Sequence, residues 1–326
     1  MKLTNRKVLI TGGAGFIGSN LIERFLTQNN QIVCLDNFAT GKKENIEPYL
    51  KNPNFKLIEG DIRDLKTCRG AVKDVELVMH QAALGSVPRS IKDPVTTNDV
   101  NIGGFVNMLQ AVREAGIKRF IYAASSSTYG DHAALPKVEE TIGKPLSPYA
   151  ITKYVNELYA EIFSNLYGIE TIGLRYFNVF GRRQDPNGAY AAAIPKFIKL
   201  LINHESPYIF GDGEQSRDFT YIENVIMANE LAATTQSPEA VNTVYNVAFG
   251  EATTVNDLID ALKENLSKFD PAITKVKAVK GEKRVGDILH SLASIDKAKR
   301  LLGYDPKYNI RAGLEQAINW YWENLK

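Results

Sequence analysis

The chain has 326 residues, of which 44% are hydrophobic and 23% are charged, and its formal net charge is +2. This composition is ordinary for a globular protein of one large or two smaller domains, and the charge gives no reason to expect nucleic acid or an anionic membrane as a partner. No apolar run is as long as a membrane-spanning helix, and the first strand is predicted so early that we expect no signal peptide. A cytoplasmic protein is therefore expected.

A strand–turn–helix–strand unit occupies the start of the chain. Residues 8–11 are a short apolar run typical of a buried strand, residues 16–28 repeat apolar side chains with a helical period, and residues 31–35 form a second buried strand. The cysteine of this second strand, Cys34, and Cys68 in a later predicted helix have no metal-like spacing. Both are predicted to be inert buried thiols of a reducing compartment, and no metal site is predicted.

Three glycines in the turn have the spacing Gly-x-x-Gly-x-x-Gly. Gly12 permits a tight exit from the strand, Gly15 a close approach of the backbone to a pyrophosphate, and Gly18 close packing of the helix on the sheet. The helix N-terminus offers N–H groups and the positive end of its dipole to phosphates. Asp36 ends the second strand about 20 residues on, where a carboxylate accepts both adenosine ribose hydroxyls and repels a 2′-phosphate. The unit predicts an NAD site.

Further ligand contacts are predicted at the carboxyl ends of the next strands. A polar loop at 37–41 is placed to wrap the adenosine, and Asp61, after the strand at 55–58, either accepts from the adenine amino group or caps the next helix. A fourth strand at 77–83 ends in small residues that leave space for a ligand. His80 lies in its apolar run, so we interpret it as a packed core histidine and not as a base.

A candidate catalytic set follows the fifth predicted strand, residues 120–124. That strand delivers Ser125 to the same edge of the sheet, and Tyr149 and Lys153 share one face of a helix predicted over 149–167. The lysine ammonium and a nearby positive nicotinamide favour the phenolate, which lowers the tyrosine pKa from about 10 towards neutrality. Ser125 would hold the substrate oxygen within reach of the tyrosine.

The strict alternation of strands and helices ends with the sixth predicted strand, at 171–177, which Asn178 follows. Shorter segments follow, including a strand at 244–247, a helix at 255–266 and two C-terminal helices. We expect an NAD-binding domain of residues 1–178 with about 218–250, and a smaller substrate lobe of about 179–217 with 251–326.

These motifs resemble the extended short-chain dehydrogenase/reductase family over nearly the whole chain, and within it the UDP-sugar 4-epimerases. The resemblance implies an α/β fold, a Rossmann-type doubly wound parallel sheet with a smaller C-terminal α/β lobe that binds a UDP-sugar, and NAD as cofactor. The segment 174–178 resembles the epimerase segment that touches nicotinamide and substrate. Relatives dimerise through helices equivalent to those at about 94–115 and 149–167, which should lie side by side, so a homodimer is expected.

The resemblance also bears on the reaction. Dehydratases of this family have an Asp-Glu pair after the catalytic hydroxyl, and decarboxylases a glutamate, whereas this chain has Ser126 and Ser127 there. Serines cannot replace that acid and base, so epimerisation by oxidation and re-reduction at C4 fits best. An NAD-dependent dehydratase or dehydrogenase, and a non-catalytic nucleotide-binding regulator, stay open as alternatives.

The substrate is predicted from fewer residues. Arg217, Arg284 and Asp287 match positions that grip UDP, and Ser291 stands where a bulky residue would exclude an N-acetyl group. The segment 85–90 resembles the subgroup that prefers UDP-N-acetylglucosamine and UDP-N-acetylgalactosamine, which we take as the substrates. Arg89 could pair with a C6 carboxylate, so a uronate stays open, as does UDP-glucose.

The residues and the resemblance together give two sets of predicted contacts. The cofactor-binding residues are Gly12, Gly15, Phe16, Ile17, Gly18, Asp36, Asn37, Phe38, Thr40, Gly41, Asp61, Ile62, Gln81, Ala82, Ala83, Asn101, Tyr149, Lys153, Tyr176 and Phe177. The substrate-binding residues are Ser86, Arg89, Ser125, Ser126, Ser127, Tyr149, Asn178, Ala193, Tyr208, Arg217, Asn246, Arg284, Asp287 and Ser291.

Overall fold

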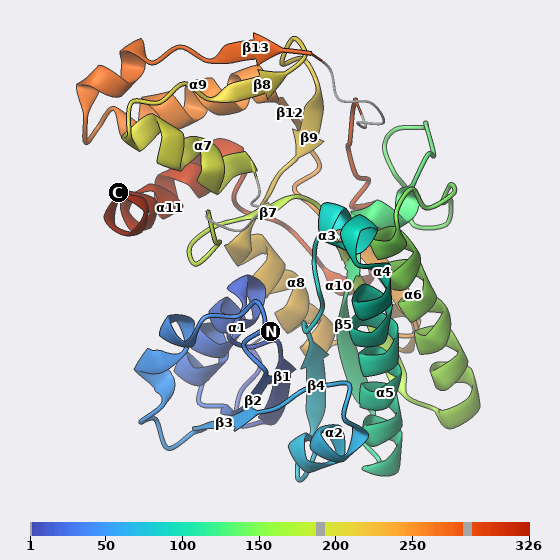
Figure 1. Cartoon of the computed structure of the whole chain (residues 1–326). Coiled ribbons are helices and arrows are strands. Elements are labelled where there is room, and N and C mark those ends of the chain that lie inside the picture. Colours follow the sequence, from blue (N-terminus) through green and yellow to red (C-terminus); the bar gives the residue numbers. More distant parts are fainter. Residues whose placement is uncertain (1, 187–192, 283–288) are drawn as a thin grey trace.

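A seven-stranded parallel sheet forms the body of the protein, seen here in a computed structural model that describes residues 2–186, 193–282 and 289–326 (Figure 1). The strand order is β11-β6-β5-β4-β1-β2-β3, so the winding direction reverses between β1 and β4. This confirms the predicted doubly wound Rossmann-type fold. The strands are β1 (Lys7–Thr11), β2 (Gln31–Asp36), β3 (Phe55–Glu59), β4 (Leu77–His80), β5 (Arg119–Ser125), β6 (Glu170–Tyr176) and β11 (Thr243–Val247).

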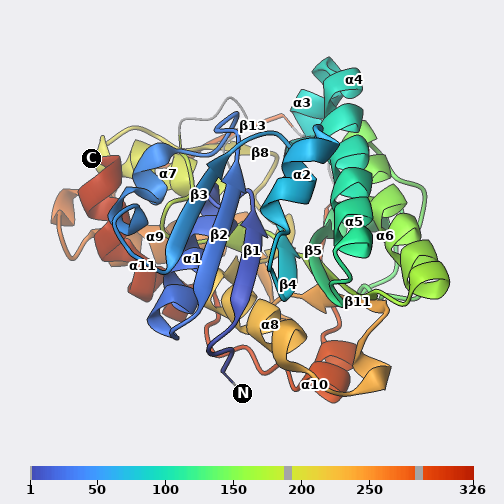
Figure 2. The ribbon, with the colours of Figure 1, turned by 90° about the horizontal axis from the view of Figure 1, so that it is seen from below.

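Successive side chains of each strand point to opposite faces of the sheet, and each face has its own apolar core. In β1, Val8 and Ile10 are buried on one face of the sheet, whereas Leu9 is buried on the other. The first face is covered by α1 (Phe16–Thr27) and α8 (Ile222–Thr234), and the second by α2 (Leu65–Ala71), α5 (Gly104–Glu114) and α6 (Pro148–Tyr167). Figures 1 and 2 show α5 and α6 side by side, as predicted.

The segment between β4 and α5 is more broken than predicted. Strand β4 ends at His80, three residues before the predicted end, and residues 81–86 follow without regular structure. The helix predicted over 94–115 consists of α4 (Pro94–Asn98), a π-helical turn (Asp99–Gly103) and α5, and the short helix α3 (Val87–Lys92) precedes it. A π-helical turn adds one residue to each hydrogen-bonded ring and is frequent at functional sites.

Most of the remaining elements form a lobe above the carboxyl edge of the sheet (Figure 1). Among the described residues it contains three two-stranded sheets, β7 with β10, β8 with β13 and β9 with β12, together with α7, α9 and α11. The bounds are β7 (Val179–Phe180), α7 (Ala193–Ile202), β8 (Tyr208–Phe210), β9 (Ser216–Asp218), β10 (Thr220–Tyr221), β12 (Ala252–Thr254), α9 (Val255–Leu266), β13 (Val279–Gly281), α10 (Asp296–Leu302) and α11 (Ile310–Leu325). Helix α10, which the predicted division gives to the lobe, contacts β11 and α8 of the body, and we keep that division as a proposal.

Within the described ranges, no helix combines the length and the apolar character needed to cross a membrane. Both cysteines are buried free thiols, as predicted.

Candidate functional site

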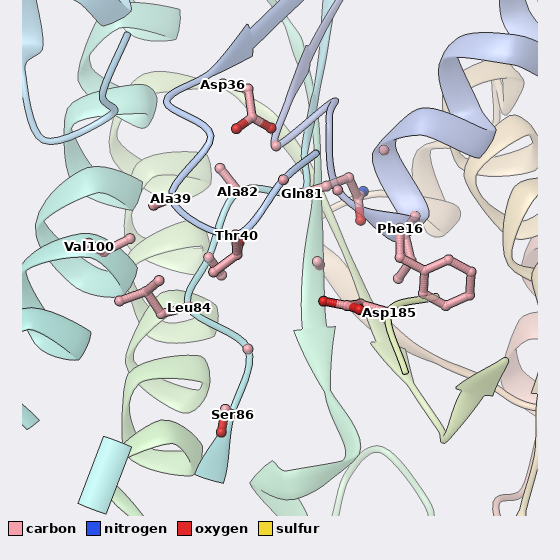
Figure 3. Close-up of a pocket in the computed structure, with 18 of the residues that line it drawn as sticks. Phe16, Asp36, Ala39, Thr40, Gln81, Ala82, Leu84, Ser86, Val100 and Asp185 are labelled. Atoms are coloured by element: carbon pink, nitrogen blue, oxygen red, sulfur yellow. The ribbon is translucent and has the colours of Figure 1, made fainter. Parts of the chain in front are cut away.

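A cavity of about 1030 Å³ runs along the carboxyl ends of the central strands. One end is lined by the glycine turn and Asp36, and the other by Ser86, Arg89 and Tyr149. Figure 3 shows Leu84 and Val100 on one side of this space and Phe16 and Asp185 on the other. The predicted residues that line it are Gly12, Gly15, Phe16, Ile17, Gly18, Asp36, Asn37, Thr40, Gly41, Asp61, Ile62, Gln81, Ala82, Ala83, Ser86, Arg89, Ser125, Ser126, Tyr149, Lys153, Tyr176 and Asn178.

The glycine turn has the close backbone approaches that its spacing predicts. Gly12 has φ +66°, and a Cβ there would lie 2.8 Å from the backbone of Ala82. A Cβ on Gly18 would collide with the carbonyl oxygen of Gly12, so this glycine lets α1 pack on the turn itself. Helix α1 has no side-chain cap, and its first residues line the cavity. The turn therefore presents uncapped helix amides and a positive dipole end to an anion.

Two carboxylates lie at the opposite end of the cavity from Tyr149. Asp36 accepts hydrogen bonds from Ala14 N at 2.9 Å and Phe38 N at 2.8 Å. Burial raises the pKa of Asp36, while these backbone bonds oppose the rise. Asp61 pairs with Arg63, which holds its pKa at about 2.

The cap of helix α2 is Asp64, whose side chain accepts from the amides of Lys66 and Thr67. Asp64 and not Asp61 therefore caps α2, whereas Asp61 Oδ1 accepts from Arg63 N at 2.8 Å in the turn that precedes this helix. His80 is buried between Phe105 and Phe120, and its Nδ1 lies 2.9 Å from Thr11 Oγ1. Burial lowers its pKa to about 3, which confirms a neutral core histidine.

Tyr149, which is half-buried, and Lys153, which is buried, lie one helical turn apart on α6 at the end of β5. Lys153 Nζ donates to the carbonyl oxygen of Ala123 at 2.8 Å and is 5.9 Å from the centre of the Tyr149 ring. Burial lowers the pKa of Lys153 to about 8, although Glu157 favours its charged form. Burial also raises the pKa of Tyr149, against a hydrogen bond with Ser125 that lowers it.

The predicted fall of the tyrosine pKa is therefore not produced by these side chains alone. Burial of the phenol outweighs the hydrogen bond with Ser125, so the pKa of Tyr149 lies above its usual value. Ser125 Oγ accepts from the amide and the hydroxyl of Ser127, at 3.2 and 2.9 Å, so its own proton is available for Tyr149 or a ligand. Ser126 lines the cavity, whereas Ser127 is not part of its lining.

Several predicted residues lie outside the cavity wall. Phe177 is fully buried in the core and packs on Tyr129, and Asn246 is buried with its amide bonded to Lys137 O and Ser294 O. Asn101 is also buried: its side chain bonds both backbone groups of Leu84. The others outside the cavity wall are Phe38, Ser127, Ala193, Tyr208, Arg217 and Ser291. Arg284 and Asp287 lie outside the described residues.

The cavity wall also has charged residues that the sequence analysis missed. Lys42 and Asp185, from two separate loops, form an ion pair at 3.1 Å. Arg183 donates to Ser19 O and Tyr49 Oη. Lys196, on α7, also lines the cavity. Two short basic pairs, Lys42–Lys43 and Arg182–Arg183, were the signals in the sequence for the lysine and arginine of these loops.

Behind the cavity wall, Asn229 of α8 bonds two of the predicted residues. It donates to Tyr176 Oη at 2.9 Å and accepts from Gln81 Nε2 at 3.3 Å, and Tyr176 donates to Gln81 Oε1 at 3.2 Å. These three side chains therefore form a closed ring of hydrogen bonds at the ends of β4 and β6. No group of three or more histidine, cysteine or carboxylate side chains that could hold a metal is found in the part of the chain that the structure describes.

Comparison with known proteins gives a consistent picture. The NAD dependent epimerase/dehydratase family matches residues 8–248. The UDP-N-acetylglucosamine 4-epimerase from Methanobrevibacter ruminantium, solved with UDP-N-acetylmuramic acid, is 37% identical with a TM-score of 0.90, and the match covers 98% of this chain and 99% of that one. The UDP-glucose 4-epimerase from Thermotoga maritima, solved with UDP-glucose, is 34% identical with a TM-score of 0.89, covering 98% and 100%. The UDP-glucuronic acid 4-epimerase from Bacillus cereus, solved with UDP-glucuronic acid and NAD, is 32% identical with a TM-score of 0.85, covering 97% and 99%.

Proposed function

The chain belongs to the NAD-dependent epimerase/dehydratase family and is a UDP-sugar 4-epimerase, and we propose that it interconverts UDP-N-acetylglucosamine and UDP-N-acetylgalactosamine. One observation carries the proposal: a single cavity joins the glycine turn to Ser125, Tyr149 and Lys153. Ser126, which follows Ser125 at the cavity wall, has no acidic group for the removal of water.

The chain's residues fit NAD. The glycine turn and the uncapped N-terminus of α1 suit a pyrophosphate, and Asp36 suits the two adenosine ribose hydroxyls. We assign Asn37, Thr40 and Gly41 to the adenosine, and Gln81 and Tyr176 to the nicotinamide end. Bound NAD would supply a reversible hydride acceptor at C4.

In this proposal the chain's own groups handle the proton. Tyr149 removes the proton of the C4 hydroxyl as the C4 hydride leaves. After the sugar has turned over, it returns the proton to the 4-keto oxygen as the hydride comes back to the opposite face of C4. Ser125 donates to the same oxygen, and the Lys153 ammonium stabilises the phenolate. Because burial raises the pKa of Tyr149, the positive charges of the lysine and the oxidised nicotinamide are both needed.

The assignment of residues that bind the UDP end of the substrate rests on fewer described residues. We assign Asn178, which lines the cavity, and Arg217, whose strand β9 pairs with β12 of the lobe. Arg284 and Asp287 keep their assignment from the sequence alone. Ser291, the predicted site of tolerance for an N-acetyl group, donates through its amide to Ser216 O.

A uronate is the second candidate, and Arg89 favours it. This guanidinium lines the sugar end of the cavity, and within the described ranges it has no hydrogen-bond or ion-pair partner. A carboxylate at C6 would supply one. UDP-glucose is the third candidate, supported by the relative solved with that sugar.

We also propose a homodimer. Helix α6 exposes a stripe of apolar side chains that includes Ile151, Leu158, Ile162 and Leu166, each at least 43% exposed. A stripe of this kind along a helix is typical of an interface, and a second copy of α6 is its simplest partner. The two buried free thiols are consistent with a cytoplasmic location.

The test is to incubate the purified protein, without added NAD, with UDP-N-acetylglucosamine, UDP-N-acetylglucosaminuronate and UDP-glucose separately, and to resolve the C4 epimers by NMR. We expect the N-acetylhexosamine to convert fastest. Faster conversion of the uronate would move the assignment to the second candidate. No epimer from any sugar, with or without NAD, would refute the epimerase. Tyr149→Phe, which keeps the ring, is the control and should be inactive.

A further inference from the structure

The backbone of Tyr149 is held by a residue far away in the sequence. Tyr149 lies in the first turn of α6, where amides have no partner within the helix. Ser147, the N-cap, accepts from Ala150 N at 3.1 Å and leaves the amide of Tyr149 unsatisfied. Ser90 Oγ, on α3, accepts from that amide at 3.0 Å.

The hydrogen bonds of Ser90 fix the orientation of its hydroxyl group. Ser90 is fully buried, and its Oγ donates to Val87 O at 2.7 Å. With the proton committed to that carbonyl, the lone pairs of the oxygen face the amide of Tyr149. The next residue back is Arg89, which lines the sugar end of the cavity. Ser90 therefore joins the segment beside the sugar to the backbone of the tyrosine.

The carbonyl of Tyr149 is held as well. Thr152 Oγ1 donates to the Tyr149 carbonyl oxygen at 2.8 Å. The same Thr152 Oγ1 accepts from Asn101 Nδ2 at 3.1 Å. Asn101 in turn bonds the amide and the carbonyl of Leu84. Both polar groups of the Tyr149 backbone are thus tied to the 84–90 segment, one through Ser90 and the other through Thr152 and Asn101.

We propose that Ser90 is a positioning residue for Tyr149: it holds the phenol where it can reach the C4 hydroxyl of a sugar bound against α3. The inference rests on the proposed function, in which Tyr149 exchanges the C4 proton. Proton transfer needs heavy atoms within hydrogen-bond reach, and a displacement of about 1 Å can cost on the order of 100-fold in rate. Loss of the Ser90 bond frees one side of the tyrosine backbone and leaves a buried amide unsatisfied.

The contrasting possibility is that Ser90 only stabilises α6. The chain offers a matched control, because Ser147 makes the same kind of bond, serine Oγ to a first-turn amide of the same helix, to the non-catalytic Ala150. A purely structural role predicts the same result for both serines. A positioning role predicts that only the Ser90 variant changes the chemistry.

The experiment compares Ser90→Ala, Ser147→Ala and wild type with UDP-N-acetylglucosamine. We expect both variants to lower Tm by a few degrees, about 2–4 °C, and to retain NAD. Ser90→Ala should lower kcat about tenfold with KM within twofold, whereas Ser147→Ala should keep the wild-type kcat. Ser90→Cys, which keeps the volume but is a weak acceptor, should be intermediate and guards against misfolding of the alanine variant. Equal kcat values for the two alanine variants would overturn the proposal.

A second readout does not depend on turnover. In protein labelled with ¹³C at the tyrosine Cζ, the Tyr149 signal is assigned by its absence in Tyr149→Phe and followed with pH. Ser90→Ala should shift its position or titration, and Ser147→Ala should not. If the wild type epimerises no sugar, the proposed function fails while this measurement still decides on Ser90: an unshifted signal overturns the positioning role and a shifted one supports it.

Discussion

Lys153 has its amino group in a buried environment that disfavours the protonated, charged form. Its side chain is almost completely buried, and burial brings its pKa from 10.5 to about 8. Between these two pH values the unfolded chain binds more protons than the folded one, so stability rises as the pH rises through that window. Below about pH 8 the folded protein bears the full desolvation cost of an ammonium that the proposed chemistry requires.

Lys153→Met is therefore expected to raise the free energy of unfolding while it removes activity. We expect a gain of about 1–3 kcal/mol at pH 7 that shrinks as the pH rises from 8 to 10.5, because the wild type then loses its buried charge. Turnover should fall at least 10²-fold. Denaturant unfolding at pH 7, 9 and 10.5, at matched NAD content, measures this. Lys196→Met, at an exposed lysine of the same cavity, is the control and should show no gain.

The residues that line the cavity were predictable where their chemistry needs a fixed spacing along the chain. The glycine turn, Asp36 and the pair of Tyr149 and Lys153 are of this kind, and all of them line the cavity. Phe177 directly follows the last residue of β6, and the sequence does not say that its ring turns into the core. Asn229 was missed because its partners come from two distant strands.

At the scale of elements, the turn between β1 and α1 depends on the absence of one side chain. The helix begins directly at the glycine turn, and Gly18 faces the Gly12 carbonyl without room for a Cβ. Helix α2 contains a contrasting glycine, Gly70, at which an added Cβ would meet nothing within 4 Å. Gly18 therefore has no room for a side chain, whereas Gly70 has room for one.

Gly18→Ala should deform the turn and reduce the NAD that copurifies with the protein, with a loss of about 1–3 kcal/mol in unfolding free energy. Gly70→Ala should keep full NAD content and add about 0.5–1 kcal/mol, because alanine is the better helix former. The absorbance ratio at 260 and 280 nm and urea unfolding of both variants measure the contrast. Equal NAD content in the two proteins would contradict this view of the turn.

Periodicity predicted the elements well where the apolar repeat is regular. Helix α9 has the predicted bounds of 255 and 266, and each of the seven sheet strands was expected. The π-helical turn at Asp99–Gly103 was not, since one extra residue in a ring hardly disturbs an apolar repeat. The apolar run of β4 continues past His80, where the backbone leaves the sheet to form the cavity wall.

At the scale of the whole molecule, the face of α4 and α6 has no covering layer within the described chain. Val95 and Ile162 are 69% and 51% exposed, in contrast to the buried α1 and α8 contacts on the other side of the sheet. Burial of this face between two copies is the arrangement we propose, and the stripe on α6 is where a charge should disrupt it.

Ile162→Asp is expected to convert the dimer into a monomer, because the interface would have to bury a carboxylate without a partner. Light scattering after gel filtration measures the mass. Val279→Asp, an equally exposed apolar position of 49% on β13 of the lobe, should remain dimeric. A wild-type protein that is monomeric at micromolar concentration would contradict the proposed homodimer.

The order of the strands also has a consequence for synthesis on the ribosome. β6 ends at Tyr176, yet its outer neighbour β11 begins only at Thr243, about 70 residues later. At 5–20 residues per second, the growing chain has the edge of β6 unpaired for on the order of 3–14 s. All but one of the residues of β6 are buried in the finished sheet, so this edge is open to wrong pairing in that interval. Codon choice and chaperone supply across residues 177–247 should therefore affect the yield of folded protein more than changes in any other connection of the sheet.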